Sequence, residues 1–112
     1  MEKQMSVFLI AEIKISDDSW VPAYAANVHK LVESQGGKYL SRSGNITAIE
    51  GAQKDCDLVA VMQFDSKTAL QAFVNDPEYQ PYAKARQAGS VSQFYMIDDT
   101  DLAGTITYLP AA

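Results

Sequence analysis

The chain has few of the side chains from which many enzyme sites are built. Its 112 residues contain one cysteine, Cys56, and one histidine, His29. A lone cysteine cannot form an internal disulfide, and the paired cysteine and histidine spacings of zinc sites are missing. We therefore expect no disulfide framework, no metal site and no cofactor.

Positive charge and long apolar runs are also scarce. The formal net charge is -5, which argues against binding to nucleic acid or to an anionic membrane. No apolar run approaches the roughly 20 residues that a membrane span requires. The apolar residues 7–11 are soon followed by Glu12 and Lys14, so they favour a strand over a signal peptide. The expected location is the cytoplasm.

The composition is that of an ordinary globular domain. Hydrophobic residues make up 47% and charged residues 21% of the chain, close to the average for folded proteins. We find no linker, low-complexity segment or internal repeat beyond a recurring strand–helix–strand unit. The expectation is a single domain over residues 1–112, with a core at about 5–98 and a C-terminal extension at 99–112.

Alternation of apolar residues predicts the first strand over residues 5–15. All its odd positions are apolar, whereas the even positions are mixed. The odd face therefore suits a layer of helices. Capping residues follow at 16–19, and apolar residues at helical spacing predict a helix that Gly36 and Gly37 end.

The second half of the chain predicts three more strands and a broken helix. Residues 38–43 and 46–50 are interpreted as one strand with a bulge at Gly44 and Asn45. Residues 58–64 predict a buried strand, and Ser66 caps a short helix. Asp76, with Pro77 after it, is typical of a new helix start. A further strand is predicted at 91–98, and the tail after it has strand-like residues at 105–109.

This order of elements predicts a ferredoxin-like βαββαβ fold with a four-stranded antiparallel sheet. Both helices should cover one face of the sheet. The other face would then expose more apolar surface than monomers usually tolerate, so we expect a second copy to cover it. Two sheets would close into a dimeric α+β barrel. The residues expected on this face are Phe8, Ile10, Val59, Val61, Tyr95 and Ile97.

A combination of short motifs resembles the domain of unknown function 1330 family of the dimeric α+β barrel superfamily. The motifs lie between residues 5 and 98: Tyr24, 36–42, Gly44, 50–51, 64–66, Ala69, 76–80 and Arg86. The resemblance implies a two-chain barrel and no established activity. The family commonly has proline where this chain has Asp65, and a tryptophan with a tyrosine near Phe73.

The only two arginines suggest a site. Arg42 could hold a carboxylate through its two-pronged donor geometry, with Glu50 as a base or orienting acid. The alternative is a structural ion pair of these two residues, joined by Arg86. The candidate ligand site comprises Tyr39, Arg42, Glu50, Tyr79 and Arg86, and the candidate catalytic residues are Glu50 and Arg42.

The other reactive side chains can each be given a purely structural interpretation as well as a functional one. The tyrosines at 24, 39, 79 and 82 could line a pocket or simply pack between the sheet and the helices. His29 is interpreted as a half-exposed helix residue, beside the apolar stripe of its helix. The acidic neighbours of Cys56 disfavour a reactive thiolate.

Two functional classes remain open. One is a cofactor-free enzyme acting on a small organic acid or an oxidisable metabolite. The other is a non-catalytic homodimer that binds a metabolite or serves an accessory role. The expected partners are a second copy of the chain and a small anionic metabolite.

Overall fold

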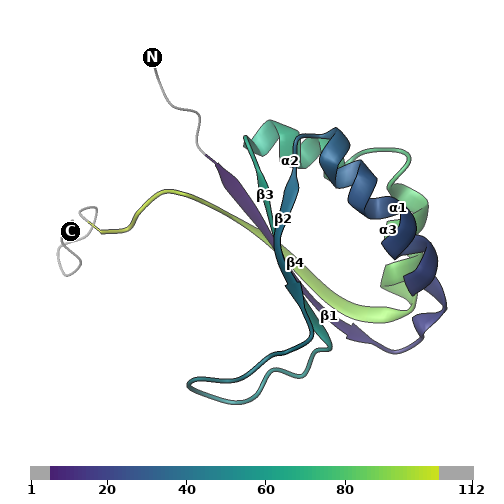
Figure 1. The fold of residues 1–112 in the computed structure, drawn as a ribbon, viewed down its shortest axis with the longest axis vertical. Coiled ribbons are helices and arrows are strands. Elements are labelled where there is room, and N and C mark those ends of the chain that lie inside the picture. Colours follow the sequence, from purple (N-terminus) through teal and green to yellow (C-terminus); the bar gives the residue numbers. More distant parts are fainter. Residues whose placement is uncertain (1–5, 104–112) are drawn as a thin grey trace.

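The computed structural model describes residues 6–103 and shows one sheet with helices on one face (Figure 1). The strands are β1 (Val7–Ile15), β2 (Lys38–Ser43), β3 (Leu58–Phe64) and β4 (Ser90–Asp98). The helices are α1 (Val21–Ser34), α2 (Lys67–Val74) and α3 (Gln80–Ala88), with a short 3₁₀ helix η1 (Asp18–Trp20) before α1.

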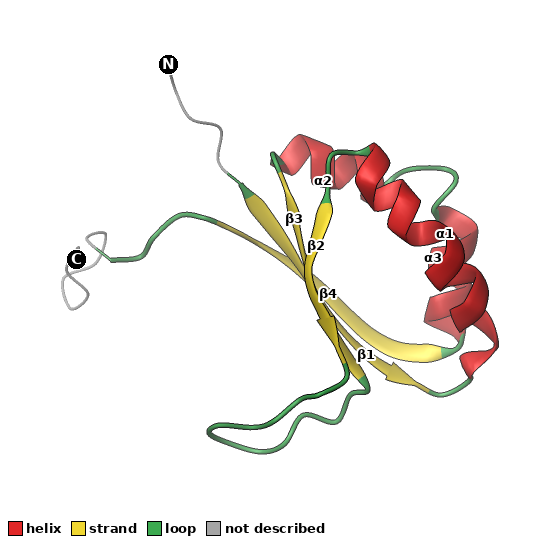
Figure 2. Cartoon of the chain, in the orientation of Figure 1, coloured by secondary structure: helices red, strands yellow, loops and turns green. Residues whose placement is uncertain are grey.

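The sheet has the order β2-β3-β1-β4, and each neighbouring pair is antiparallel. This is the ferredoxin-like arrangement predicted from the sequence. Figure 2 shows the helices together along one side of the sheet, while the opposite side carries no helix. No helix within residues 6–103 is long and apolar enough to cross a membrane.

Alternation along β1 divides its side chains between the two faces as predicted. Val7, Leu9, Ala11 and Ile13 are buried beneath the helices. The even-numbered Ile10 lies on the uncovered face, level with Val61 of β3 and Tyr95 of β4. The core therefore forms between the odd face of β1 and the helices.

The predicted capping residues act one element before α1. Asp17 accepts a hydrogen bond from the Ser19 amide at 2.9 Å and caps η1, whereas Trp20, the residue before α1, provides no side-chain cap. Pro22 occupies the first turn of α1 as predicted. Gly36 ends the helix with a φ of +79°, a left-handed conformation that glycine adopts without strain. At Gly37, a Cβ atom would lie only 2.4 Å from the Phe64 ring. This glycine is required by packing.

The predicted second half of β2 is wrong. Residues 44–57 form a long loop that extends away from the sheet (Figure 1). The Gln53 side chain holds this loop internally, accepting from the Ala48 amide and donating to the Ile46 carbonyl. Ile49 is 93% exposed, so the β-branched residues that suggested a strand have no partner strand here.

Two further boundaries differ from the prediction. The bulge in β2 lies between Tyr39 and Ser41, not at residues 44–45. Asp76 accepts from the Glu78 amide at 2.9 Å and caps a turn, after which α3 begins only at Gln80. The strand-like residues 105–109 lie outside the described residues.

Replacing Gly37 with alanine should destabilise the protein by about 1–3 kcal/mol, the usual cost of overpacking a core. The new methyl group would overlap the Phe64 ring and Val32. Urea denaturation of Gly37→Ala, Phe64→Leu and the double variant measures the effect. Because the smaller leucine leaves room for the new methyl group, the double variant should lose less stability than the two single variants lose together. Strict additivity would contradict the proposed contact.

Candidate functional site

A cavity of about 130 Å³ lies between α1 and the covered face of the sheet. Apolar side chains of β1 and β3, among them Ile13 and Met62, form part of its lining. Helix α1 and the residue before it contribute Tyr24, His29 and Trp20. The volume is close to the roughly 150 Å³ of an apolar cavity that binds benzene. The space therefore suits one ring or a short carbon chain.

Arg42 supplies a positive charge to this mostly apolar cavity. Its guanidinium carbon lies 4.1 Å from the centre of the Tyr39 ring, in cation–π geometry. Among residues 6–103, no carboxylate forms an ion pair with Arg42. Glu50 lies exposed in the 44–57 loop and is in none of the ion pairs of the described residues. The Arg42–Glu50 pairing considered from the sequence is therefore not formed.

The bulge in β2 explains why Tyr39 and Arg42 share one cavity. Side chains three residues apart on a regular strand point to opposite faces. Here Tyr39 pairs with Met62 and Arg42 pairs with Ala60, and both partners are buried on the covered face. The extra residue between them restores the shared orientation.

The His29 ring stacks on Tyr39 at a centroid distance of 5.2 Å. Its Nε2 lies 3.4 Å from a carboxylate oxygen of Glu33, one helical turn further on. Burial raises the pKa of Tyr39, and Arg42 partly opposes that rise. A phenol, an imidazole and a guanidinium therefore meet at one cavity.

Arg86 occupies a different environment. It is only 5% exposed, and its guanidinium lies 4.1 Å from the centre of the Phe94 ring. It donates to Ser92 and, at 3.4 Å, to the Tyr79 hydroxyl, while its Nε has no hydrogen-bond partner. Within the described chain it forms no ion pair with a carboxylate.

Arg86 and Tyr79 line a second cavity, of about 340 Å³, beside α3 and β4. The candidate site from the sequence is therefore divided in the structure. Tyr39 and Arg42 meet at the first cavity, Tyr79 and Arg86 at the second, and Glu50 lies at neither. Phe94 lines both cavities, so they are neighbours across one ring.

Tyr24 connects the two groups. Its hydroxyl lies 3.2 Å from the Tyr79 hydroxyl, and its ring lies 5.3 Å from Trp20 in an edge-to-face contact. Burial raises the pKa of Tyr24 well above its usual range, and Tyr79 adds to the shift. Trp20 in turn donates to the Gly89 carbonyl at 3.2 Å. Tyr82 packs against the core and lines neither cavity.

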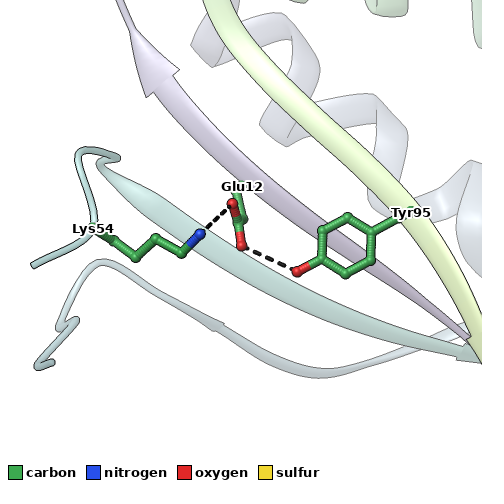
Figure 3. A network of polar contacts seen from close by, with 3 residues as sticks. All are labelled: Glu12, Lys54 and Tyr95. Carbon is green, nitrogen blue, oxygen red and sulfur yellow. Dashed lines mark hydrogen bonds and ion pairs between the residues drawn. The ribbon is translucent and has the colours of Figure 1, made fainter. Parts of the chain in front are cut away.

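On the uncovered face, Glu12 accepts hydrogen bonds from Lys54 at 3.0 Å and from Tyr95 at 3.1 Å (Figure 3). These bonds, Lys54 first, hold the pKa of Glu12 below its ordinary value. The network ties the 44–57 loop to β1 and β4. Cys56 lies nearby, in the lining of a shallow polar hollow. Within residues 6–103 no cluster of histidine, cysteine and acidic side chains could hold a metal ion.

Sequence reasoning missed His29 and Trp20 as parts of the site. The helical spacing could have indicated His29. Val21, Ala25 and His29 follow one another at intervals of four residues, so they share a face of α1, and all three line the cavity. His29 was interpreted as a half-exposed residue because it lies beside the apolar stripe of its helix and not on it. His29 instead lies where α1 contacts β2, through its stacking on Tyr39.

Comparison with known proteins agrees with this architecture. The family model described as Domain of unknown function (DUF1330) matches residues 6–100. The chain belongs to the DUF1330 family. No curated protein matches it.

Several solved structures share the fold of this DUF1330 protein. A protein of unknown function from Rhodopseudomonas palustris is 18% identical, with a TM-score of 0.74 over 88% of this chain and 85% of the other. SnoaB, a cofactor-independent oxygenase from Streptomyces nogalater, is 16% identical, with a TM-score of 0.61 over 87% and 95%. A dabb family protein with a ferredoxin-like fold from Mesorhizobium loti is 15% identical, with a TM-score of 0.60 over 89% and 100%.

Proposed function

We propose that this DUF1330 protein binds a small organic acid with an apolar body in the cavity beneath α1. The observation that carries the proposal is Arg42, a cation at a mostly apolar cavity without a carboxylate of its own. A guanidinium presents its donors in a planar fork that matches a carboxylate. Stacking on Tyr39 holds that fork in place.

The lining defines the rest of the ligand. Ala11, Ile13, Ala60 and Met62 offer no hydrogen bonds from their side chains, so a polar body would lose its hydration without replacement. An aliphatic chain or a single ring gains from burial in the same place. The favoured ligand therefore has one carboxylate and an apolar remainder.

A second candidate function is catalysis without a cofactor. In it, His29 is the group that takes a proton from a carbon atom of the bound acid. The supporting observation is that His29 lines the same cavity and stacks on Tyr39 beside Arg42. Imidazole is the side chain best suited to proton transfer near neutral pH. SnoaB, which shares the fold, is described as a cofactor-independent oxygenase. The alternative remains a metabolite-binding dimer without activity.

We also propose that the protein is a homodimer whose two uncovered sheet faces pack together. Ile97 is 51% and Tyr95 is 45% exposed on that face, next to the half-buried Phe8 and Ile10. A contiguous apolar surface of this kind is unusual on a monomer. A standard interface would bury about 800 Å² on each partner.

Replacing Arg42 with lysine should weaken the binding of small carboxylates about tenfold, because the charge stays while the fork is lost. The measurement is a thermal-shift screen with benzoate and C4–C6 aliphatic acids, followed by calorimetry on those that stabilise the wild type. Lys84→Gln, on the exposed side of α3, is the control and should bind normally. Failure of every acid to stabilise the wild type would contradict the proposal.

If the protein is an enzyme, His29→Gln should abolish turnover while leaving carboxylate affinity within about twofold, since Arg42 is the anchor. Uptake of deuterium from solvent into a bound acid, followed by NMR, reports proton removal directly. Oxygen consumption reports a subsequent oxidation by O₂. If the wild type binds an acid but shows neither signal, the non-catalytic alternative is favoured.

A charge at Val61 should dissociate the dimer, because an unpaired buried carboxylate in an apolar interface costs several kcal/mol. Light scattering of the wild type should return twice the chain mass of 12.3 kDa, and Val61→Glu should return the single mass. Gln71→Glu, on the exposed side of α2, is the matched control. A wild type that is monomeric at tens of micromolar would rule out the barrel.

A further inference from the structure

Tyr24 and Tyr79 together carry two hydroxyl hydrogens, but the hydrogen bond between them involves only one. Each phenol carries one O–H, and a single hydrogen bond joins the two oxygens at 3.2 Å. The third member, Arg86, offers only donors and cannot accept. Within residues 6–103 neither hydroxyl has another acceptor. One hydroxyl hydrogen of the pair is therefore left without a protein partner.

The position of Arg86 indicates which of the two tyrosines carries the hydroxyl hydrogen without a partner. Arg86 donates to the Tyr79 oxygen, and a hydroxyl that accepts from a cation becomes a better donor itself. Tyr79 should then donate to Tyr24. The chain of hydrogen bonds runs from Arg86 through Tyr79 to Tyr24, and the unused hydrogen belongs to Tyr24.

Tyr24 lines the cavity beneath α1, which Arg42 also lines. Burial keeps this phenol in its neutral, donating form, since it raises the pKa of Tyr24. Tyr24 is half-buried, and a donor that is partly removed from water gains from an acceptor nearby. A ligand oxygen in this cavity would satisfy it.

We propose that Tyr24 is a ligand-binding residue that donates a hydrogen bond to a second oxygen of the bound acid, with Arg86 and Tyr79 as positioning residues behind it. This inference rests on the proposed function and narrows it. The ligand class becomes short organic acids that carry, apart from the carboxylate, a carbonyl or similar acceptor oxygen. Oxo acids are the simplest members.

Two probes of nearly equal shape test the inference. 4-Oxopentanoate carries a carbonyl where 4-methylpentanoate carries a methyl branch, and calorimetry gives the affinity of each. Tyr24→Phe should weaken 4-oxopentanoate about three- to tenfold, the effect of one hydrogen bond, and change 4-methylpentanoate less than twofold. Tyr82→Phe removes a phenol outside both cavities and should change neither affinity.

Stability without ligand tests the place of Tyr79 between Arg86 and Tyr24. Tyr79→Phe removes two hydrogen bonds, one with Arg86 and one with Tyr24, whereas Tyr24→Phe removes only one. Tyr79→Phe should therefore lower the midpoint of urea unfolding more than Tyr24→Phe. The opposite order would contradict the positioning role of Tyr79 and overturn that part of the proposal.

The outcomes separate this inference from the proposed function. If both probes bind the wild type and Tyr24→Phe affects them equally, the acid site stands and the role of Tyr24 is wrong. If neither probe binds, and no other carboxylate does, the acid site itself is wrong and the inference falls with it. Selective loss of 4-oxopentanoate, with the expected order of stabilities, supports both.

Discussion

Strand β1 is hydrogen-bonded along its length to β3 on one side and to β4 on the other, so each of its side chains is fixed to one face of the sheet. A shift of one residue would exchange the two faces. The odd face forms the core with α1, α2 and α3 and also part of the cavity beneath α1. The even face carries Ile10 and Glu12 and has no helix over it. The candidate ligand site and the proposed dimer surface therefore depend on the same pairing.

The arginines and the lysines of the described residues differ in their contacts. The net charge is -5, yet neither arginine forms an ion pair with a carboxylate within residues 6–103. The described ion pairs of the lysines lie on the outside, where Lys54 and Lys14 hold the 44–57 loop against β1. Arg42 and Arg86 instead contact aromatic rings, which balance part of their charge without neutralising it. Such a guanidinium can still interact with an anion.

Much of the fold could be predicted from local patterns. Alternation identified both faces of β1, and the glycines after α1 identified its end. The 46–50 segment was misinterpreted because its β-branched residues have strand propensity. The pairing of β2 with β3 ends at Ser43 and Val59, so no described strand lies beside the segment. The start of α3 was placed too early because the Asp76 cap closes a turn first.

The site was harder to predict, for physical reasons. The arginines, Tyr39 and Tyr79 were identified as unusual, but their division between two cavities depends on the packing of α1 and α3. The Tyr24–Tyr79 contact joins residues 55 apart in the chain. Nothing local specifies that distance, so no spacing rule could show which phenol would retain an unused hydrogen.

The bulge in β2 has a consequence for the way this region can change during evolution. Tyr39 and Arg42 reach one cavity only because a single extra residue lies between their paired positions. If Leu40 were retained but paired regularly, the strand and every chemical group would remain, but the guanidinium would be transferred to the opposite side of the sheet. The pairing of this short segment is thus under as much constraint as its composition, and insertions are far better tolerated a few residues later, in the loop that follows.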